Sequence, residues 1–310
     1  MPIRPVACVG IATLDLVHRI RAFPARPVKL RAESFATSAG GMAAFAACAI
    51  ARLAGGAQFW GPTGDDAFGD TIRRELCDAG VDASIVAPVA GTTSSHSVVI
   101  VDGQGERLII NHRGSALSCG ADILPLDRLD ASAVLADVRW PPGAGAMLDR
   151  ANALGIPTVL DAESGEIEAL RMLVPRARHV IFSEPGFEQW SGINCNSAEA
   201  HDRLRALCDS GAALAAITRG ERGVVHVTRD SGPGRTPAFT IEAVETLGAG
   251  DVFHGAYALG IAEGIPIAQA LRFASAAAAV KCTRAGGRAG VPSRAEVNAL
   301  LAQSMRASPD

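Results

Sequence analysis

Short apolar runs alternate with longer helical patterns along almost the whole chain, and this alternation constrains the fold more than any other feature. Strands that alternate with helices are typical of a parallel sheet whose faces are covered by helices. The sequence therefore predicts an α/β fold with a mostly parallel central sheet. The predicted strands are Val6–Val9, Gln58–Trp60, Ala133–Val138, Thr158–Asp161, His179–Phe182, Ala213–Thr218 and Val224–Val227, and the predicted helices are Met42–Ala54, Phe68–Ala79, Ala144–Leu154, Ala198–Cys208, Ala249–Glu263, Ile267–Cys282 and Arg294–Ser304.

Two segments, residues 13–35 and 95–113, break this alternation. The first is rich in Arg and Pro and has no helix signal. The second is typical of a hairpin, with strands Ser97–Val101 and Arg107–Asn111 on either side of an Asp-Gly-Gln-Gly turn. We expect a small antiparallel sheet that projects from a single domain spanning residues 1–310.

Composition excludes several functional classes. A net charge of −3 with interspersed acids and bases offers no electrostatic surface for nucleic acid or a membrane. The 7 cysteines are odd in number and show no C-x-x-C spacing, which favours a reducing compartment over a disulfide framework. No apolar run approaches the ~20 residues that span a bilayer, and the first residues lack a cleavage signature. We therefore expect a soluble, cytoplasmic protein.

A glycine-rich turn near the C-terminal end carries the strongest chemical signal. Gly248, Ala249 and Gly250 are followed by Asp251 and then by an apolar helical run. Backbone N–H groups at a helix start are unpaired, and the helix dipole favours negative charge there. A carboxylate beside such an anion site can accept a hydroxyl proton during phosphoryl transfer. Asp251 is therefore the predicted catalytic base, and the three preceding amides are predicted to stabilise the transferred group.

These residues, with the earlier glycine-rich stretch Ala39–Phe45, resemble the two signatures of the PfkB (ribokinase-like) family of carbohydrate kinases. The resemblance covers nearly the whole chain. It implies a ribokinase-like three-layer α/β sandwich with a small β lid, and a phosphotransferase that uses ATP and Mg²⁺. In this family such a lid covers the sugar and often forms the dimer interface. An exposed lid sheet with one apolar face needs a partner, so we expect a homodimer.

The resemblance also implies a nucleotide site and two cation sites. Thr218, Gly220 and Gly223 match the family's T-x-G-x-x-G turn, and Ser275 matches a nucleotide-contacting position. Ser183 and Gly186 stand where the family has the Asn and Glu that organise Mg²⁺. Glu184 and Glu188 are candidate substitutes, and the metal ligands stay unassigned. The family's potassium loop has an aspartate where this chain has Glu245, whereas Arg284 and Gly286 fit, so K⁺ is a third candidate cofactor.

The sugar half of the predicted site contains cations. Asp15 matches an acidic residue that accepts hydrogen bonds from sugar hydroxyls, and Gly40 and Gly41 allow close approach of the backbone. Met42 and Phe45 replace the asparagines of ordinary ribokinases, which argues against a neutral ribose-like substrate. Arg139 follows a buried strand and therefore faces the usual ligand crevice of a parallel sheet. Its guanidinium suits a tetrahedral oxyanion.

Viewed together, these departures resemble one branch of the family, the sulfofructose kinases. By that resemblance Lys29, Asn111 and Arg139 hold the sulfonate of 6-deoxy-6-sulfofructose, and Asp251 activates its 1-hydroxyl. Alternatives are a fructose 6-phosphate or tagatose 6-phosphate kinase, another PfkB sugar kinase, and a catalytically silent sugar-binding relative. The segments that carry the resemblance are Val6–Gly10, Gly105–Asn111, Leu135–Trp140, Phe182–Gly186, Gly248–Ala256 and Lys281–Val291.

Overall fold

The computed structural model describes residues 4–306, which fold around an eight-stranded sheet with the order β14-β13-β12-β11-β10-β9-β1-β4. Neighbouring strands from β4 to β12 run parallel, and β13 and β14 add an antiparallel edge. The carboxyl ends of the parallel strands therefore lie at one edge, where ligands bind in open α/β sheets. The strands are β1 (Val6–Val9), β4 (Ala57–Trp60), β9 (Ala133–Asp137), β10 (Thr158–Ala162), β11 (His179–Ser183), β12 (Leu214–Thr218), β13 (Val224–Thr228) and β14 (Ser231–Thr236).

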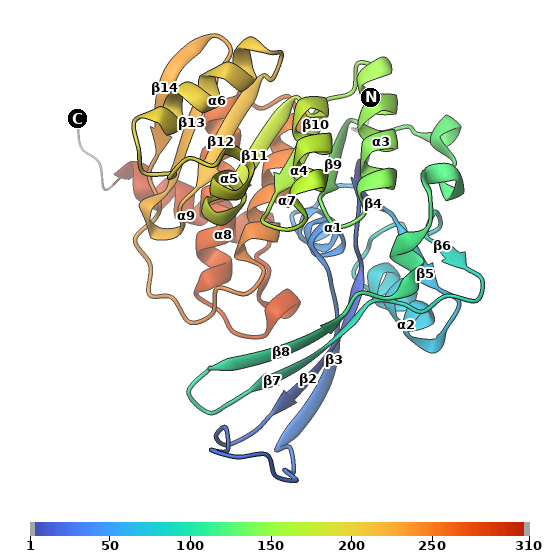
Figure 1. The fold of residues 1–310 in the computed structure, drawn as a ribbon. Helices are drawn as coiled ribbons and strands as arrows, with labels where there is room; N and C mark the ends of the chain where they lie inside the picture. Colours follow the sequence, from blue (N-terminus) through green and yellow to red (C-terminus); the bar gives the residue numbers. More distant parts are fainter. Residues whose placement is uncertain (1–3, 307–310) are drawn as a thin grey trace.

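Helices cover both faces of this sheet and make three layers (Figure 1). Each face has its own apolar core, because strands buried on both sides present side chains alternately to the two helix layers. On one face lie α3 (Pro141–Ala153), α4 (Ile167–Leu173), α5 (Glu184–Ser191) and α6 (Glu199–Asp209), and on the other α1 (Met42–Arg52), α7 (Ala249–Ala262), α8 (Ile267–Cys282) and α9 (Arg294–Arg306).

A second, four-stranded sheet projects from the core as a ribbon of strands (Figure 1). The predicted hairpin is confirmed, since β7 (His96–Val101) pairs antiparallel with β8 (Arg107–His112). β2 (Thr13–Arg19) pairs antiparallel with β3 (Ser34–Gly40), but its other neighbour, β7, runs parallel to it. The sheet is thus antiparallel at its two edges and parallel at its centre, because β2 and β7 both leave the core in the same direction.

The predicted strands and long helices of the core are confirmed, with ends that shift by a few residues, and the shorter elements were missed. α4 and α5 are too brief to establish a helical period, and α5 contains Pro185 and Gly186 in its first turn. β14 is rich in Gly and polar residues and forms only as an antiparallel edge on β13. α2 (Ala67–Asp78) packs beside β2 and β3. Within residues 4–306 no helix is long and apolar enough to cross a membrane.

Candidate active site

The glycine turn places Asp251 in the first turn of α7. Gly248 is the N-cap and has φ +76°, a left-handed conformation that a side chain disfavours. The Ala249 amide already donates to the carbonyl of Thr246 at 3.1 Å. Among the described residues, the amides of Gly248 and Gly250 have no acceptor, so these two remain as donors for an anion.

Asp251 lies on the wall of a large cleft of about 1280 Å³ between the core and the projecting sheet. Asp15, Gly40, Gly41 and Gly248 line the same cleft, so the structure brings these predicted site residues together. Burial, and next the carboxyl of Asp161, raise the pKa of Asp251 to about 8. A carboxyl with a pKa in this range is suited to accept a proton near neutral pH.

His254, one turn further along α7, is a buried neighbour that sequence reasoning missed. Its Nδ1 lies 2.8 Å from the carbonyl oxygen of Gly250 and 3.2 Å from Oδ2 of Asp161. The ring therefore links the glycine turn to the carboxyl end of β10. Its spacing of three residues from Asp251 was a signal that the two share a helix face.

A second, smaller cleft of about 450 Å³ adjoins the first, and Gly41 lines both. Asn111, Arg113, Arg139 and Glu166 line this second cleft. Arg113 donates to Glu166 at 2.5 Å and to the carbonyl of Arg139 at 3.3 Å. No carboxylate among the described residues forms an ion pair with the Arg139 guanidinium, whose charge acts at longer range on Asp137, Asp161 and Glu163. Arg139 is therefore the unpaired cation of the second cleft.

Asp137, at the end of β9, fixes the backbone between the two clefts. The sequence analysis did not predict this role. Its buried carboxylate accepts from the amides of Ile11 at 2.9 Å, Ala43 at 3.0 Å and Arg139 at 2.8 Å. Gly10 leaves room for it, since a Cβ there would lie 2.2 Å from Asp137 Cγ. One carboxylate thus fixes the start of the loop to β2, the first turn of α1 and the backbone of Arg139.

Lys29 is the predicted sugar-binding residue that the structure does not bring to the others. It lies in the exposed loop between β2 and β3 and lines neither cleft. By contrast, the Asp15 carboxylate lies beside Gly40, where a Cβ would stand 2.4 Å from Asp15 Oδ2. Glycine at position 40 therefore allows the close approach of Asp15 to β3.

Four of the predicted nucleotide residues lie at or just beyond the carboxyl ends of β11 and β12, where Ser183 pairs in register with Thr218. The Ser183 hydroxyl caps α5 and donates to Oε1 of Glu163 at 2.7 Å. Gly223 has φ +79°, and a Cβ there would meet the carbonyl oxygen of Thr236 at 2.3 Å. Gly220 lies in the same turn, and the buried Ser275 hydroxyl on α8 has no hydrogen-bond partner among the described residues.

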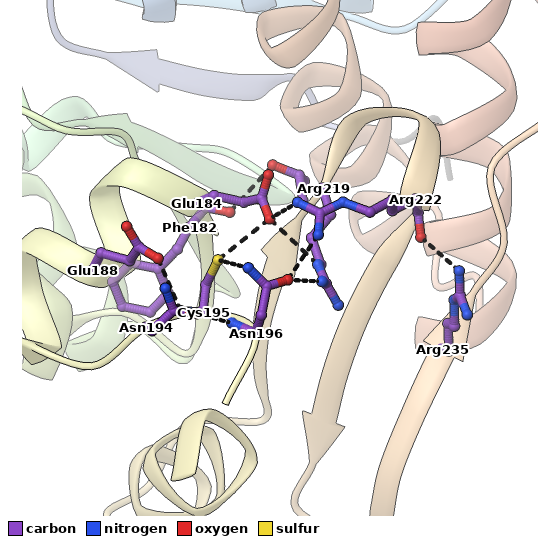
Figure 2. A network of polar contacts seen from close by, with 10 residues as sticks. Phe182, Glu184, Glu188, Asn194, Cys195, Asn196, Arg219, Arg222 and Arg235 are labelled. Atoms are coloured by element: carbon purple, nitrogen blue, oxygen red, sulfur yellow. Dashed lines mark hydrogen bonds and ion pairs between the residues drawn. The ribbon is translucent and has the colours of Figure 1, made fainter. Parts of the chain in front are cut away.

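Glu184 and Glu188, the candidate substitutes for a magnesium-organising glutamate, are held by other groups. Figure 2 shows Glu184 paired with Arg219 and Arg222, while Asn196 accepts hydrogen bonds from both arginines. Glu188 accepts from the amide of Cys195 at 3.0 Å. Glu184 therefore belongs to this arginine network, and Glu188 binds the backbone beside it, so their part in organising magnesium stays a prediction. Glu163, which Ser183 contacts, is the carboxylate at this edge that the sequence did not indicate.

Comparison with known proteins decides the family. Residues 4–294 match the profile described as pfkB family carbohydrate kinase. The chain belongs to this family. Its members are phosphotransferases with an alcohol group as acceptor, so this chain is a carbohydrate kinase.

Relatives of this pfkB-family kinase include ribokinases and fructokinases. It is 28% identical to the "Ribokinase" of Bacillus subtilis, with 96% of this chain and 99% of the relative covered. It is 29% identical to "Fructokinase-1" of Zea mays, with 87% and 90% covered. The fold of a "putative ribokinase" from Agrobacterium tumefaciens superposes with a TM-score of 0.87 at 36% identity, covering 98% and 99% of the chains. The predicted ribokinase-like fold is confirmed.

The structure of Arabidopsis thaliana ribokinase complexed with ribose and ATP is also similar. Its TM-score is 0.83 at 25% identity, and 97% of this chain and 99% of that chain are covered. In this pfkB-family kinase the Phe45 ring packs beneath the glycine turn: a Cβ at Gly248 would lie 2.4 Å from its Cζ. Phe45 therefore shapes the wall of the large cleft beside Asp251.

Proposed function

We propose that this kinase transfers the terminal phosphoryl group of ATP to the 1-hydroxyl of a ketohexose that carries an anion at C6, namely the sulfonate of 6-deoxy-6-sulfofructose. The observation that carries this proposal is the junction of the two clefts at Gly41. Asp251 lies on one side of the junction and the unpaired Arg139 on the other. A sugar across Gly41 would present one end to the base and the other to the guanidinium.

The chemistry at the first end follows from the groups around Asp251. Its carboxylate accepts the proton of the sugar hydroxyl while the oxygen forms a bond to phosphorus and the bond from phosphorus to the leaving diphosphate breaks. The amides of Gly248 and Gly250 stabilise the negative charge on the transferred group, because preorganised donors are most effective in a site that excludes water. Asp15 and the backbone at Gly40 and Gly41 are the proposed contacts of the sugar hydroxyls.

The charge of the second cleft favours a sulfonate over a phosphate. Arg113 is neutralised by Glu166, and Asn111 is uncharged and donates to the Ser97 hydroxyl at 3.1 Å. Arg139 alone supplies an unpaired positive charge. A sulfonate carries one negative charge, whereas a phosphate monoester carries about −1.5 to −2 near neutral pH. One free guanidinium with neutral donors therefore matches the sulfonate more closely.

The proposed nucleotide contacts are Ser183, Thr218, Gly220, Gly223 and Ser275, around the edge of β11 and β12. ATP is supported as the donor by the ATP complex of the Arabidopsis ribokinase. Magnesium suits the site only as an ion held by nucleotide phosphates and water, since residues 4–306 contain no cluster of three metal-ligating side chains. Glu163 is the carboxylate placed to accept hydrogen bonds from such water molecules. The ion would neutralise charge on the phosphates.

A substrate panel tests this function. Release of ADP is measured with sulfofructose, fructose 6-phosphate, tagatose 6-phosphate, fructose and ribose. We expect the highest kcat/KM for sulfofructose. Arg139→Ala should raise the KM for sulfofructose by about 10- to 100-fold, as expected for a lost hydrogen bond to a charged group, while the KM for ATP stays unchanged.

The matched control is Arg4→Ala, which removes an exposed arginine paired with Asp130 and should leave both KM values unchanged. Equal turnover of plain fructose or ribose would contradict the anion pocket and favour the activities named for the relatives. A preference for either sugar phosphate would support the anion pocket but would show that its anion is a phosphate and not a sulfonate.

We also propose that the kinase is a homodimer joined through the projecting sheet, which would act as a lid. Phe35 on β3 is 58% exposed and Ile110 on β8 is 59% exposed. Together with Leu108 and Ile109 they leave apolar side chains exposed on both edge strands. A second copy would cover these residues.

A further inference from the structure

Lys281, at the end of α8, is a fully buried lysine that the proposed mechanism does not use. The chain contains only two lysines, and the other, Lys29, is exposed. A buried ammonium group is tolerated only where an opposite charge and hydrogen bonds replace its hydration. Lysine at this position therefore requires an explanation from its surroundings.

The Lys281 ammonium bridges the segment before the glycine turn and the turn after α8. Its Nζ lies 3.2 Å from Oε1 of Glu245 and 3.5 Å from the carbonyl oxygen of Arg284. Glu245 also accepts from the amides of Gly286 at 3.2 Å and Gly287 at 2.9 Å. Although burial opposes it, these two amides and the ammonium lower the pKa of Glu245. Glu245 is therefore an anion held by three donors.

The backbone on either side is joined to the same place. The amides of Val244 and Glu245 donate to the carbonyl of Cys282 at 2.8 and 3.1 Å. The chain then runs from Glu245 through Thr246 and Leu247 to the glycine turn that precedes Asp251. A positive charge at Lys281 thus fixes the approach to the proposed phosphoryl site.

These contacts bear on the potassium ion that the family resemblance implies. Glu245, Arg284 and Gly286 do converge, but the oxygen atoms that would coordinate the ion already contact the Lys281 ammonium. A potassium ion beside a buried ammonium would bring two positive charges into contact in a region of low dielectric constant, which is strongly unfavourable. The residues therefore do not fit a potassium ion.

We propose that the Lys281 ammonium is a built-in monovalent cation that replaces potassium, so that this kinase neither binds nor requires K⁺. The inference concerns the phosphotransferase reaction and not the identity of the sugar. The measurements of Tm and of thallium binding described below use no sugar. They therefore test the proposal even if sulfofructose is the wrong acceptor.

The first experiment uses the unmodified protein. Its Tm and its rate of phosphoryl transfer are measured from no added K⁺ to about 0.1 M KCl, with tetramethylammonium chloride holding the ionic strength constant. We expect neither quantity to change. Crystals soaked in a thallium salt should show no anomalous peak beside Glu245. Activation by K⁺, a K⁺-specific rise in Tm or a thallium peak at this place would each overturn the proposal.

Lys281→Ala converts the filled site into an empty one. We expect its rate to fall by about tenfold or more, as for loss of a buried charge partner. K⁺ or methylammonium should then restore part of the rate and raise the Tm, whereas neither ion should affect the Arg4→Ala control. Lys281→Met keeps the apolar stem and serves if the alanine variant does not fold. A folded variant that lost neither rate nor Tm, or regained neither with K⁺ or methylammonium, would contradict the proposal.

Discussion

At the scale of single residues, Asp251 and Asp137 have different roles near the large cleft. Asp251 is partly exposed to the cleft and has a raised pKa, which suits a group that gains and loses a proton. Asp137 is buried and accepts hydrogen bonds from three amides, which suits a group that holds the backbone in place. The two aspartates are predicted to respond differently to substitution.

Asp251→Asn should retain the fold and lower kcat by about 10²–10⁴, the usual contribution of a general base. It should also be more stable than the parent at alkaline pH. The parent keeps the Asp251 proton up to a pKa of about 8, while the unfolded chain releases it near the ordinary value of 3.8. Stability from this group is therefore complete below the unfolded pKa and is lost as the pH rises towards 8.

The measurement is the Tm of both proteins between pH 5 and pH 9. The advantage of the asparagine variant should grow with pH and level off once the pH exceeds the folded pKa. In parallel, kcat/KM of the parent should rise with pH through the same region. A variant whose Tm lies at a constant offset from that of the parent would contradict the raised pKa.

Asp137→Ala should lower the free energy of unfolding by about 3 kcal/mol, because it leaves three buried amides without an acceptor. Urea denaturation measures this change. Asp149→Ala is the control, since Asp149 forms only an exposed pair with Arg176 and should change stability by less than about 0.5 kcal/mol. Equal stability of the two variants would show that Asp137 does not organise the site.

At the scale of elements, the sequence predicted the helices and strands that their own residues specify. It missed some that form only through pairing with another segment. α7 and α8 were predicted because their apolar runs are long enough to establish a helical pattern. The edge strand β14 depends on pairing with β13, a contact that no local pattern encodes. The parallel pairing of β2 with β7 joins segments more than 75 residues apart and could not be deduced from either one.

The site follows the same rule. The glycine turn and Asp251 share a helix start, so local sequence was sufficient to propose them. Asp137 and Glu163 act through partners that are distant in sequence, Ala43 and Ser183, so only the folded chain reveals them. The ion pairs of Glu184 with Arg219 and Arg222, which follow the next strand, likewise could not be deduced from local sequence.

At the scale of the whole molecule, the projecting sheet is anchored firmly at its base. The amide of Ala39 on β3 donates to Glu75 of α2 at 2.5 Å, and Arg288 pairs with the same glutamate at 2.8 Å. The sheet is thereby tied both to α2 and to the loop that follows α8. Among residues 4–306 no ion pair joins the far end of the sheet to the core, and the exposed apolar residues of the sheet favour association.

Ile110→Asp should convert the proposed dimer into a monomer, because a buried unpaired carboxylate opposes contact between the two sheets. Light scattering after size-exclusion chromatography measures the mass against the 31.9 kDa of one chain. Leu154→Asp, on another exposed apolar side chain, is the control and should leave the mass unchanged. A parent protein that is monomeric at every concentration would disprove association through this sheet.

The scarcity of lysine offers a practical opportunity. With Lys281 sealed inside the molecule, Lys29 is the one lysine open to reagents that attack primary amines. A dye introduced by such a reagent at high pH would mark the loop between β2 and β3 alongside the terminal amine. Quenching or energy transfer from that position would then follow the tip of the sheet as sugar is added, without any engineered cysteine.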